Sequence, residues 1–86
     1  METETIEQAI DAALNRVAPE VEVRALDRRI ALRDQFEMDS VDFLRFVLDL
    51  ERRLGVAIPQ VDYPKLSSLG GCAAYLQHLG PPPDAT

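Results

Sequence analysis

The residues with the clearest chemical potential are Asp39 and Ser40, in the stretch EMDSVDFL at positions 37–44. A serine at the start of a helix has a hydroxyl to which another group could be attached, at the positive end of the helix dipole. Aspartate and serine are also common helix caps. The pair therefore has two interpretations, a helix cap alone or a cap joined to a modification site.

Two further residues, Cys72 and His78, have reactive side chains without a recognisable site around them. Cys72 is the one cysteine, so no internal disulfide can form, and no Cys/His cluster has metal-ligand spacing. We expect Cys72 to be a small buried hydrophobic residue and His78 to lie on the surface near the end of the last helix. The sequence predicts no catalytic residues and no metal site, and an enzyme is the least favoured class.

Composition limits the possible partners and compartment. The chain has 86 residues, enough for one small domain, and its formal net charge of −6 argues against nucleic-acid binding. The acidic N-terminus lacks the basic region of a signal peptide, and no apolar run approaches the roughly 20 residues that cross a bilayer. We expect a cytoplasmic protein without membrane insertion, whose partners are proteins with basic surfaces.

Two long helices are predicted from apolar periodicity and from end signals. The first covers residues 3–17, where apolar residues recur at helical spacing and a proline follows. The second covers residues 40–54, with Asp39 as its N-cap and Gly55 directly after its last residue. Both helices have an apolar face that must pack against other elements.

The remaining elements are shorter or irregular. Residues 20–38 show no sustained period and form a long connection that we expect its apolar side chains to hold against the core. A short helix or turn is predicted around residues 61–66, and a last helix from Ser67 or Ser68 to Leu79. These elements complete an all-helical domain.

The end of the chain contains residues that oppose regular structure. Gly70 and Gly71 lie in the last helix, and each costs on the order of 1 kcal/mol relative to alanine, so its first turn is predicted to be weak. Three consecutive prolines follow the helix. We therefore expect one helical domain at residues 1–80 and a flexible tail at residues 81–86.

A helical wheel divides the second helix into three faces. The core face consists of apolar residues: Phe43, Phe46, Val47, Leu50 and Leu54. A polar face, predicted to be solvated, consists of Asp42, Arg45, Asp49, Arg52 and Arg53. A second apolar stripe remains, formed by Val41, Leu44 and Leu48. This stripe either packs against another helix of the domain or stays exposed as a docking surface for another protein.

The order of these elements resembles the acyl carrier protein family. A first amphipathic helix and a long loop are followed by MDSVDFLRFVLDLERRLGVAIP, and then by YPKLSSL leading into a final helix. The resemblance covers nearly the whole chain, residues 6–79, without a large insertion. It implies an all-α fold, a small four-helix bundle of the acyl-carrier type, with three main helices, one short helix and a long loop between helices 1 and 2.

The resemblance also implies a function and a site. Ser40 would carry 4′-phosphopantetheine donated from coenzyme A, with Asp39 beside it, and acyl groups would travel as thioesters on that arm. Residues after the serine would contact partner enzymes: Val41, Asp42, Leu44, Arg45 and Leu48. The implied partners are a phosphopantetheinyl transferase, an acyl-loading ligase or transferase, and a ketosynthase or acyltransferase. A monomer is expected, and Tyr75 would border the space for the acyl chain.

Departures from the family pattern suggest a specialised role. Arg45, Arg52 and Arg53 stand where the best-known fatty-acid carriers usually have acidic residues, which points to a dedicated fatty-acid, lipid or polyketide pathway. Two alternatives stay open. One is a peptidyl or aminoacyl carrier of non-ribosomal synthesis, and the other is an unmodified helical adaptor that docks through Val41, Leu44 and Leu48.

Overall fold

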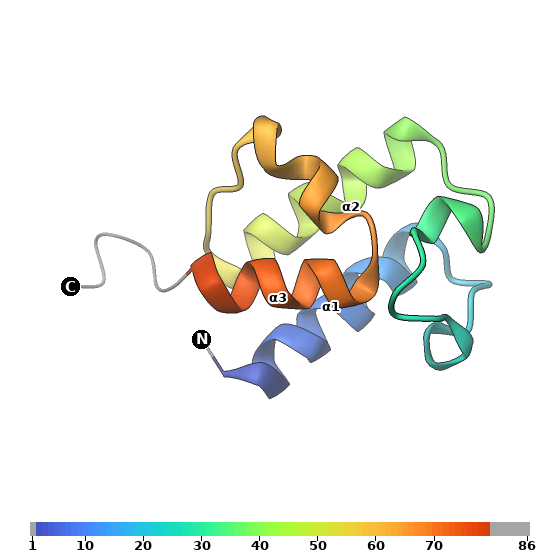
Figure 1. Cartoon of the computed structure of the whole chain (residues 1–86), viewed down its shortest axis with the longest axis horizontal. Coiled ribbons are helices and arrows are strands. Elements are labelled where there is room, and N and C mark those ends of the chain that lie inside the picture. Colours follow the sequence, from blue (N-terminus) through green and yellow to red (C-terminus); the bar gives the residue numbers. More distant parts are fainter. Residues whose placement is uncertain (1, 80–86) are drawn as a thin grey trace.

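The computed structural model describes residues 2–79, and the regular elements among these residues are all helices. The described residues form three α-helices, α1 (Thr3–Val17), α2 (Ser40–Leu54) and α3 (Leu69–Leu79). Helix α1 packs against both α2 and α3 (Figure 1). The predicted all-α fold of acyl-carrier type is confirmed, whereas the predicted tail at residues 81–86 lies outside the described residues.

Helices α1 and α2 have the bounds that the sequence predicts. The Asp39 carboxylate accepts a hydrogen bond from the backbone N–H of Asp42 at 2.8 Å, which makes it the N-cap of α2. Gly55 ends α2 with a φ of 65°, in the left-handed region where glycine has no steric penalty. Local end signals are therefore sufficient to define this helix.

The connection between α1 and α2 is held to the domain by backbone and side-chain contacts, as predicted. It contains two short 3₁₀ helices, η1 (Val23–Ala25) and η2 (Leu32–Asp34). Leu32 is buried, and its backbone N–H donates to the Ser67 carbonyl oxygen at 2.8 Å. Arg28 forms two hydrogen bonds with the Glu7 carboxylate of α1, at 2.8 and 3.1 Å. The connection therefore has a defined path across the domain.

The 3₁₀ helix η3 (Gln60–Leu66) joins α2 to α3 and replaces the short helix or turn predicted at residues 61–66. Helix α3 starts at Leu69, slightly later than predicted, because the Ser68 hydroxyl accepts the Gly71 N–H at 3.0 Å and so caps it. η3 packs against α3, and the Tyr75 hydroxyl donates to Asp62 at 2.7 Å. That bond ties η3 to the outer side of α3.

Gly70 and Gly71 allow two backbone segments to approach α3 closely. The Gly70 N–H donates to the Arg28 carbonyl oxygen at 2.8 Å, and a Cβ at Gly70 would lie 2.9 Å from that oxygen. A Cβ at Gly71 would lie 2.8 Å from the Lys65 carbonyl oxygen. The glycines therefore have a packing role that their low helix propensity alone does not suggest.

The core face predicted for α2 is largely confirmed. Phe46, Val47 and Leu50 are fully buried, and Phe43 and Leu54 pack against the core from its edge. Among residues 2–79, no helix has both the length and the apolar character needed to cross a bilayer.

One residue of the predicted solvated face, Asp49, is buried, so that part of the prediction is wrong. Asp49 is 5 % exposed, and its carboxylate binds Arg52 and Arg53 of α2 and lies 3.9 Å from the Arg16 guanidinium of α1. Burial raises the pKa of the Asp49 carboxyl, but the hydrogen bonds and charges of Arg53 and Arg52 outweigh it and hold the pKa below its usual value. A wheel of one helix cannot show that α1 covers this position.

Candidate functional site

Ser40 is the first residue of α2, and it is exposed. Because Asp39 directs its carboxylate to the N–H of Asp42, the cap does not occupy the Ser40 hydroxyl. The hydroxyl thus lies at the positive end of the α2 dipole, where a phosphate group would be stabilised. The two sequence interpretations of the Asp39-Ser40 pair are therefore compatible, since Asp39 supplies the cap and Ser40 stays accessible.

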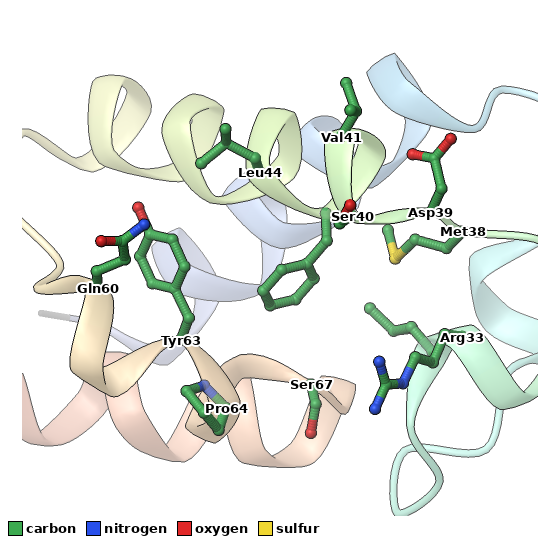
Figure 2. Close-up of a pocket in the computed structure, with 12 residues that line it drawn as sticks. Arg33, Met38, Asp39, Ser40, Val41, Leu44, Gln60, Tyr63, Pro64 and Ser67 are labelled. Carbon is green, nitrogen blue, oxygen red and sulfur yellow. The ribbon is translucent and has the colours of Figure 1, made fainter.

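A cavity of about 620 Å³ lies beside Ser40 (Figure 2). Its walls come from the connection before α2, from the first turns of α2, and from η3 with the residue after it. The residues that line it are Leu32, Arg33, Met38, Asp39, Ser40, Val41, Phe43, Leu44, Gln60, Tyr63, Pro64 and Ser67. A group attached to Ser40 would start at the edge of this cavity.

Aromatic contacts connect the cavity to the core. Phe43 lies edge-on to Tyr63 of η3 at a centroid distance of 6.2 Å, and it contacts buried Phe46 at 6.4 Å. Figure 2 shows Tyr63 rising from η3 toward α2. Tyr75, which the resemblance places beside the acyl space, does not line this cavity, because its hydroxyl binds Asp62 instead.

The second apolar stripe of α2 is exposed to solvent. The exposed fractions of Val41, Leu44 and Leu48 are 54, 40 and 50 %, respectively. The alternative in which the stripe packs against a second helix of this domain is therefore wrong. Val41 and Leu44 also line the cavity, so the stripe is continuous with the surroundings of Ser40.

The arginines of α2 are not equivalent. Arg52 and Arg53 bind the buried Asp49 carboxylate, whereas Arg45 is exposed and forms no ion pair with the residues that the structure describes. Asp42 is partly exposed at the other end of the stripe. Arg45 is thus the arginine of α2 with the most freedom to contact another molecule.

Cys72 and His78 do not line the cavity beside Ser40. Cys72 is buried, and this burial raises the pKa of its thiol to about 12, so the reactive thiolate is scarce at neutral pH. The exposed His78 ring donates from Nδ1 to the Ala74 carbonyl oxygen at 2.8 Å. The burial of Cys72 and the exposure of His78 confirm the predictions of a packing residue and a surface residue, respectively.

Several cavity residues were not identified from the sequence. Arg33 and Gln60 belong to short 3₁₀ helices, and Ser67 follows one of them. No apolar period marks which of their side chains reach the cavity. Figure 2 shows Arg33 on the side of η2, across the cavity from Tyr63. The one signal that the sequence offers for this part of the cavity is the aromatic residue of YPKLSSL, Tyr63, which lines it.

Comparison with known proteins agrees with the family that the sequence resembles. A family model described as a phosphopantetheine attachment site matches residues 4–76. An acyl carrier protein of Lactobacillus johnsonii is 32 % identical over 69 residues, which cover 73 % of this chain and 86 % of that protein. One from Brachyspira hyodysenteriae is 32 % identical over 44 residues, or 51 % of this chain and 56 % of the relative. No solved structure gives a significant match.

Proposed function

We propose, from the premise that this chain belongs to the acyl carrier protein family, that Ser40 carries its prosthetic group. In this family 4′-phosphopantetheine is attached covalently to a serine. The observation that carries the proposal is the position of Ser40, exposed at the start of α2 and at the edge of the 620 Å³ cavity. Ser40 lies at a helix N-terminus and directly precedes the exposed apolar stripe of Val41, Leu44 and Leu48.

The other two serines fit the role less well. The Ser68 hydroxyl already caps α3 by accepting the Gly71 N–H. Ser67 is exposed and lines the same cavity, but it precedes α3 without an exposed apolar stripe beside it. Ser67 is therefore the natural comparison for Ser40, since the two hydroxyls share one cavity and differ in helix position.

The chain itself would present the prosthetic group rather than perform chemistry. When bound, the group supplies the thiol that holds acyl groups as thioesters. Asp39 keeps the first turn of α2 in place, and the apolar wall formed by Met38, Phe43 and Leu44 gives an acyl chain a dry surface. We infer that this protein is a carrier and not a catalyst.

We further propose that the carrier serves a dedicated fatty-acid, lipid or polyketide pathway. Arg45, which is exposed and has no ion pair among residues 2–79, supports this, because a positive charge beside the stripe would oppose partners built for acidic carriers. The expected partners remain a phosphopantetheinyl transferase, an acyl-loading ligase or transferase, and a ketosynthase or acyltransferase. A monomer in the cytoplasm is the corresponding expectation.

The attachment site is tested by intact mass after incubation with coenzyme A, magnesium and a broad-specificity phosphopantetheinyl transferase. The native chain and Ser67→Ala should each gain the mass of one phosphopantetheine, and Ser40→Ala should gain none. Circular dichroism should show all three folded. Modification of Ser40→Ala, or its absence in the native chain while a known carrier is modified in parallel, would contradict the assignment.

The pathway proposal is tested by binding to a general fatty-acid ketosynthase. Arg45→Glu should bind this enzyme more tightly than the native chain, by about fivefold for one reversed exposed charge. Equal affinity of the two proteins would remove the charge argument for a dedicated pathway while leaving Ser40 as the attachment site.

Two alternatives have their own support. A peptidyl or aminoacyl carrier would present the same serine and stripe, and identifying the loading enzyme would separate it from an acyl carrier. An unmodified adaptor would use the exposed Val41, Leu44 and Leu48 without the prosthetic group. The mass measurement separates the adaptor from both carriers, because only carriers gain phosphopantetheine.

A further inference from the structure

A second groove lies between the end of α1 and the outer side of α2. Its volume is about 410 Å³, and it shares no residue with the cavity beside Ser40. Both helices contribute to its lining, which consists of Arg16, Val17, Arg45, Leu48, Asp49 and Arg52. Half of these residues are arginines, an unusual concentration in a chain whose net charge is −6.

The groove is locally positive. Its one carboxylate, Asp49, is buried and hydrogen-bonded to Arg52 and Arg53, so against three lining guanidiniums the local charge is +2. The Arg16 and Arg52 side chains are 64 and 65 % exposed, and Arg45 is exposed and free of ion pairs within residues 2–79. Each guanidinium has five N–H donors in a planar fork, so donors remain for a further anion.

The groove is continuous with the docking stripe. Leu48 lines it and is also the last residue of the stripe, with half of its surface exposed. Leu48 stands eight positions after Ser40, which at 1.5 Å per residue places it roughly 12 Å farther along α2. An interface of ordinary size, about 800 Å² on each partner, can cover both Ser40 and the groove.

We propose that this groove binds a carboxylate side chain of the partner protein that loads or receives the cargo, while an apolar side chain of that partner packs on Leu48. The proposal rests on the proposed function, because it concerns the enzymes that meet Ser40. The planar guanidinium of arginine can donate two parallel hydrogen bonds to one carboxylate. Because Leu48 offers an apolar contact beside the arginines, we expect this carboxylate to belong to a protein segment and not to a small free anion. The partner surface is therefore acidic at this position.

This conclusion differs from the basic partner that the net charge alone suggests. At physiological ionic strength the Debye length is about 8 Å, so charges within the interface outweigh those on the far side of the domain. The acidic residues near Ser40, Asp39 and Asp42, lie at the opposite end of the stripe. The docking face is thus divided by sign along α2.

The test uses the full chain and two synthetic amphipathic helical peptides of equal length. The acidic peptide carries leucine and glutamate, and the basic peptide carries lysine at every glutamate position. Backbone amide shifts of Arg16, Leu48 and Arg52 are followed during titration at low and high salt. The variant is Arg45→Glu, and its matched control is Arg24→Glu, an equal charge change on exposed η1.

The acidic peptide should shift these three amides and bind more weakly as salt increases. Arg45→Glu should weaken its binding about fivefold or more, and Arg24→Glu by less than about twofold. The proposal is overturned if the basic peptide shifts the same amides equally, or if the two variants weaken binding alike. It is also overturned if sedimentation shows that a second copy of this chain occupies the stripe.

The titration is independent of the prosthetic group. Selective acidic binding, together with a failure of the transferase to modify Ser40, would support the groove and contradict the carrier function. Modification of Ser40 without selective binding would leave the carrier function in place and overturn this inference.

Discussion

At the scale of single residues, Asp39 and Ser40 divide two roles that the sequence presents together. The Asp39 carboxylate accepts the Asp42 N–H, and the Ser40 hydroxyl stays exposed beside the cavity. Serine is itself a good helix cap, and a capping hydroxyl would be engaged in a hydrogen bond. Because the preceding aspartate caps α2 instead, the Ser40 hydroxyl is available for modification.

Replacing Asp39 tests its role as a cap. Asp39→Ala should lower the free energy of unfolding by about 1 kcal/mol, because an N–H of the first turn of α2 loses its acceptor. Asp39→Asn should remain within a few tenths of a kcal/mol of the native chain, since asparagine caps as well. Urea unfolding at neutral pH measures both. A loss in Asp39→Asn equal to that in Asp39→Ala would indicate that the charge, and not the cap, stabilises this helix.

At the scale of secondary structure, the start of α3 depends on segments that lie far away in the chain. Gly70 allows the Arg28 carbonyl oxygen to reach its backbone N–H, and Gly71 lies against the Lys65 carbonyl oxygen. The connection, η3 and α3 therefore meet at these two glycines. The same connection supplies Leu32 and Arg33 to the cavity, so this junction positions one of its walls.

Gly70→Ala distinguishes packing from helix propensity. Propensity alone predicts a gain of about 1 kcal/mol in the free energy of unfolding. The 2.9 Å approach of a new Cβ to backbone oxygen predicts instead a loss of about 1–3 kcal/mol, because backbone yields less than a side chain. The reverse substitution Ala74→Gly, at an exposed position of α3, is the control and should cost about 1 kcal/mol. Increased stability of Gly70→Ala in thermal unfolding would contradict the packing role.

At the scale of the whole molecule, Asp49 connects the charges of two helices. Its carboxylate accepts hydrogen bonds from Arg52 and Arg53 within α2, lies near Arg16 of α1, and lines the groove. A carboxylate this buried is tolerated because its oxygens have charged donors. The Asp49 carboxylate therefore contributes to the stability of the fold and holds arginines of the docking face in place.

The stability of the fold should therefore depend on pH through Asp49. Since the pKa of Asp49 is lower in the folded chain than its usual value of 3.8, its contribution is present above pH 3.8. The contribution is lost as the pH falls through the folded-state pKa. Asp49→Asn should lower the free energy of unfolding at neutral pH by about 1.5–3 kcal/mol, the range for hydrogen bonds to charged groups.

Denaturant unfolding across acidic and neutral pH provides the measurement. Asp49→Asn should lose less stability on acidification than the native chain, whereas Asp11→Asn, at an exposed position of α1, should follow the native curve. If Asp49→Asn and the native chain lose stability in parallel, other carboxylates account for the acid sensitivity.

The sequence by itself determined the helices and the residue most suited to modification. The bounds of α1 and α2 follow from local signals, namely apolar spacing, the Asp39 cap and the Gly55 terminus, which act within a few residues. The same periodicity identified the Val41, Leu44 and Leu48 stripe. The order of the helices and the Asp-Ser motif identified the family, and the family match over residues 4–76 confirms that identification.

Only the tertiary structure decided which faces are covered. The stripe is exposed because no described helix covers it, while Asp49 is buried because the end of α1 packs over a face that looks polar on the wheel. The cavity beside Ser40 and the arginine groove each combine segments distant in sequence. Burial depends on the neighbours that folding brings together, and the periodicity of one helix contains no information about those neighbours.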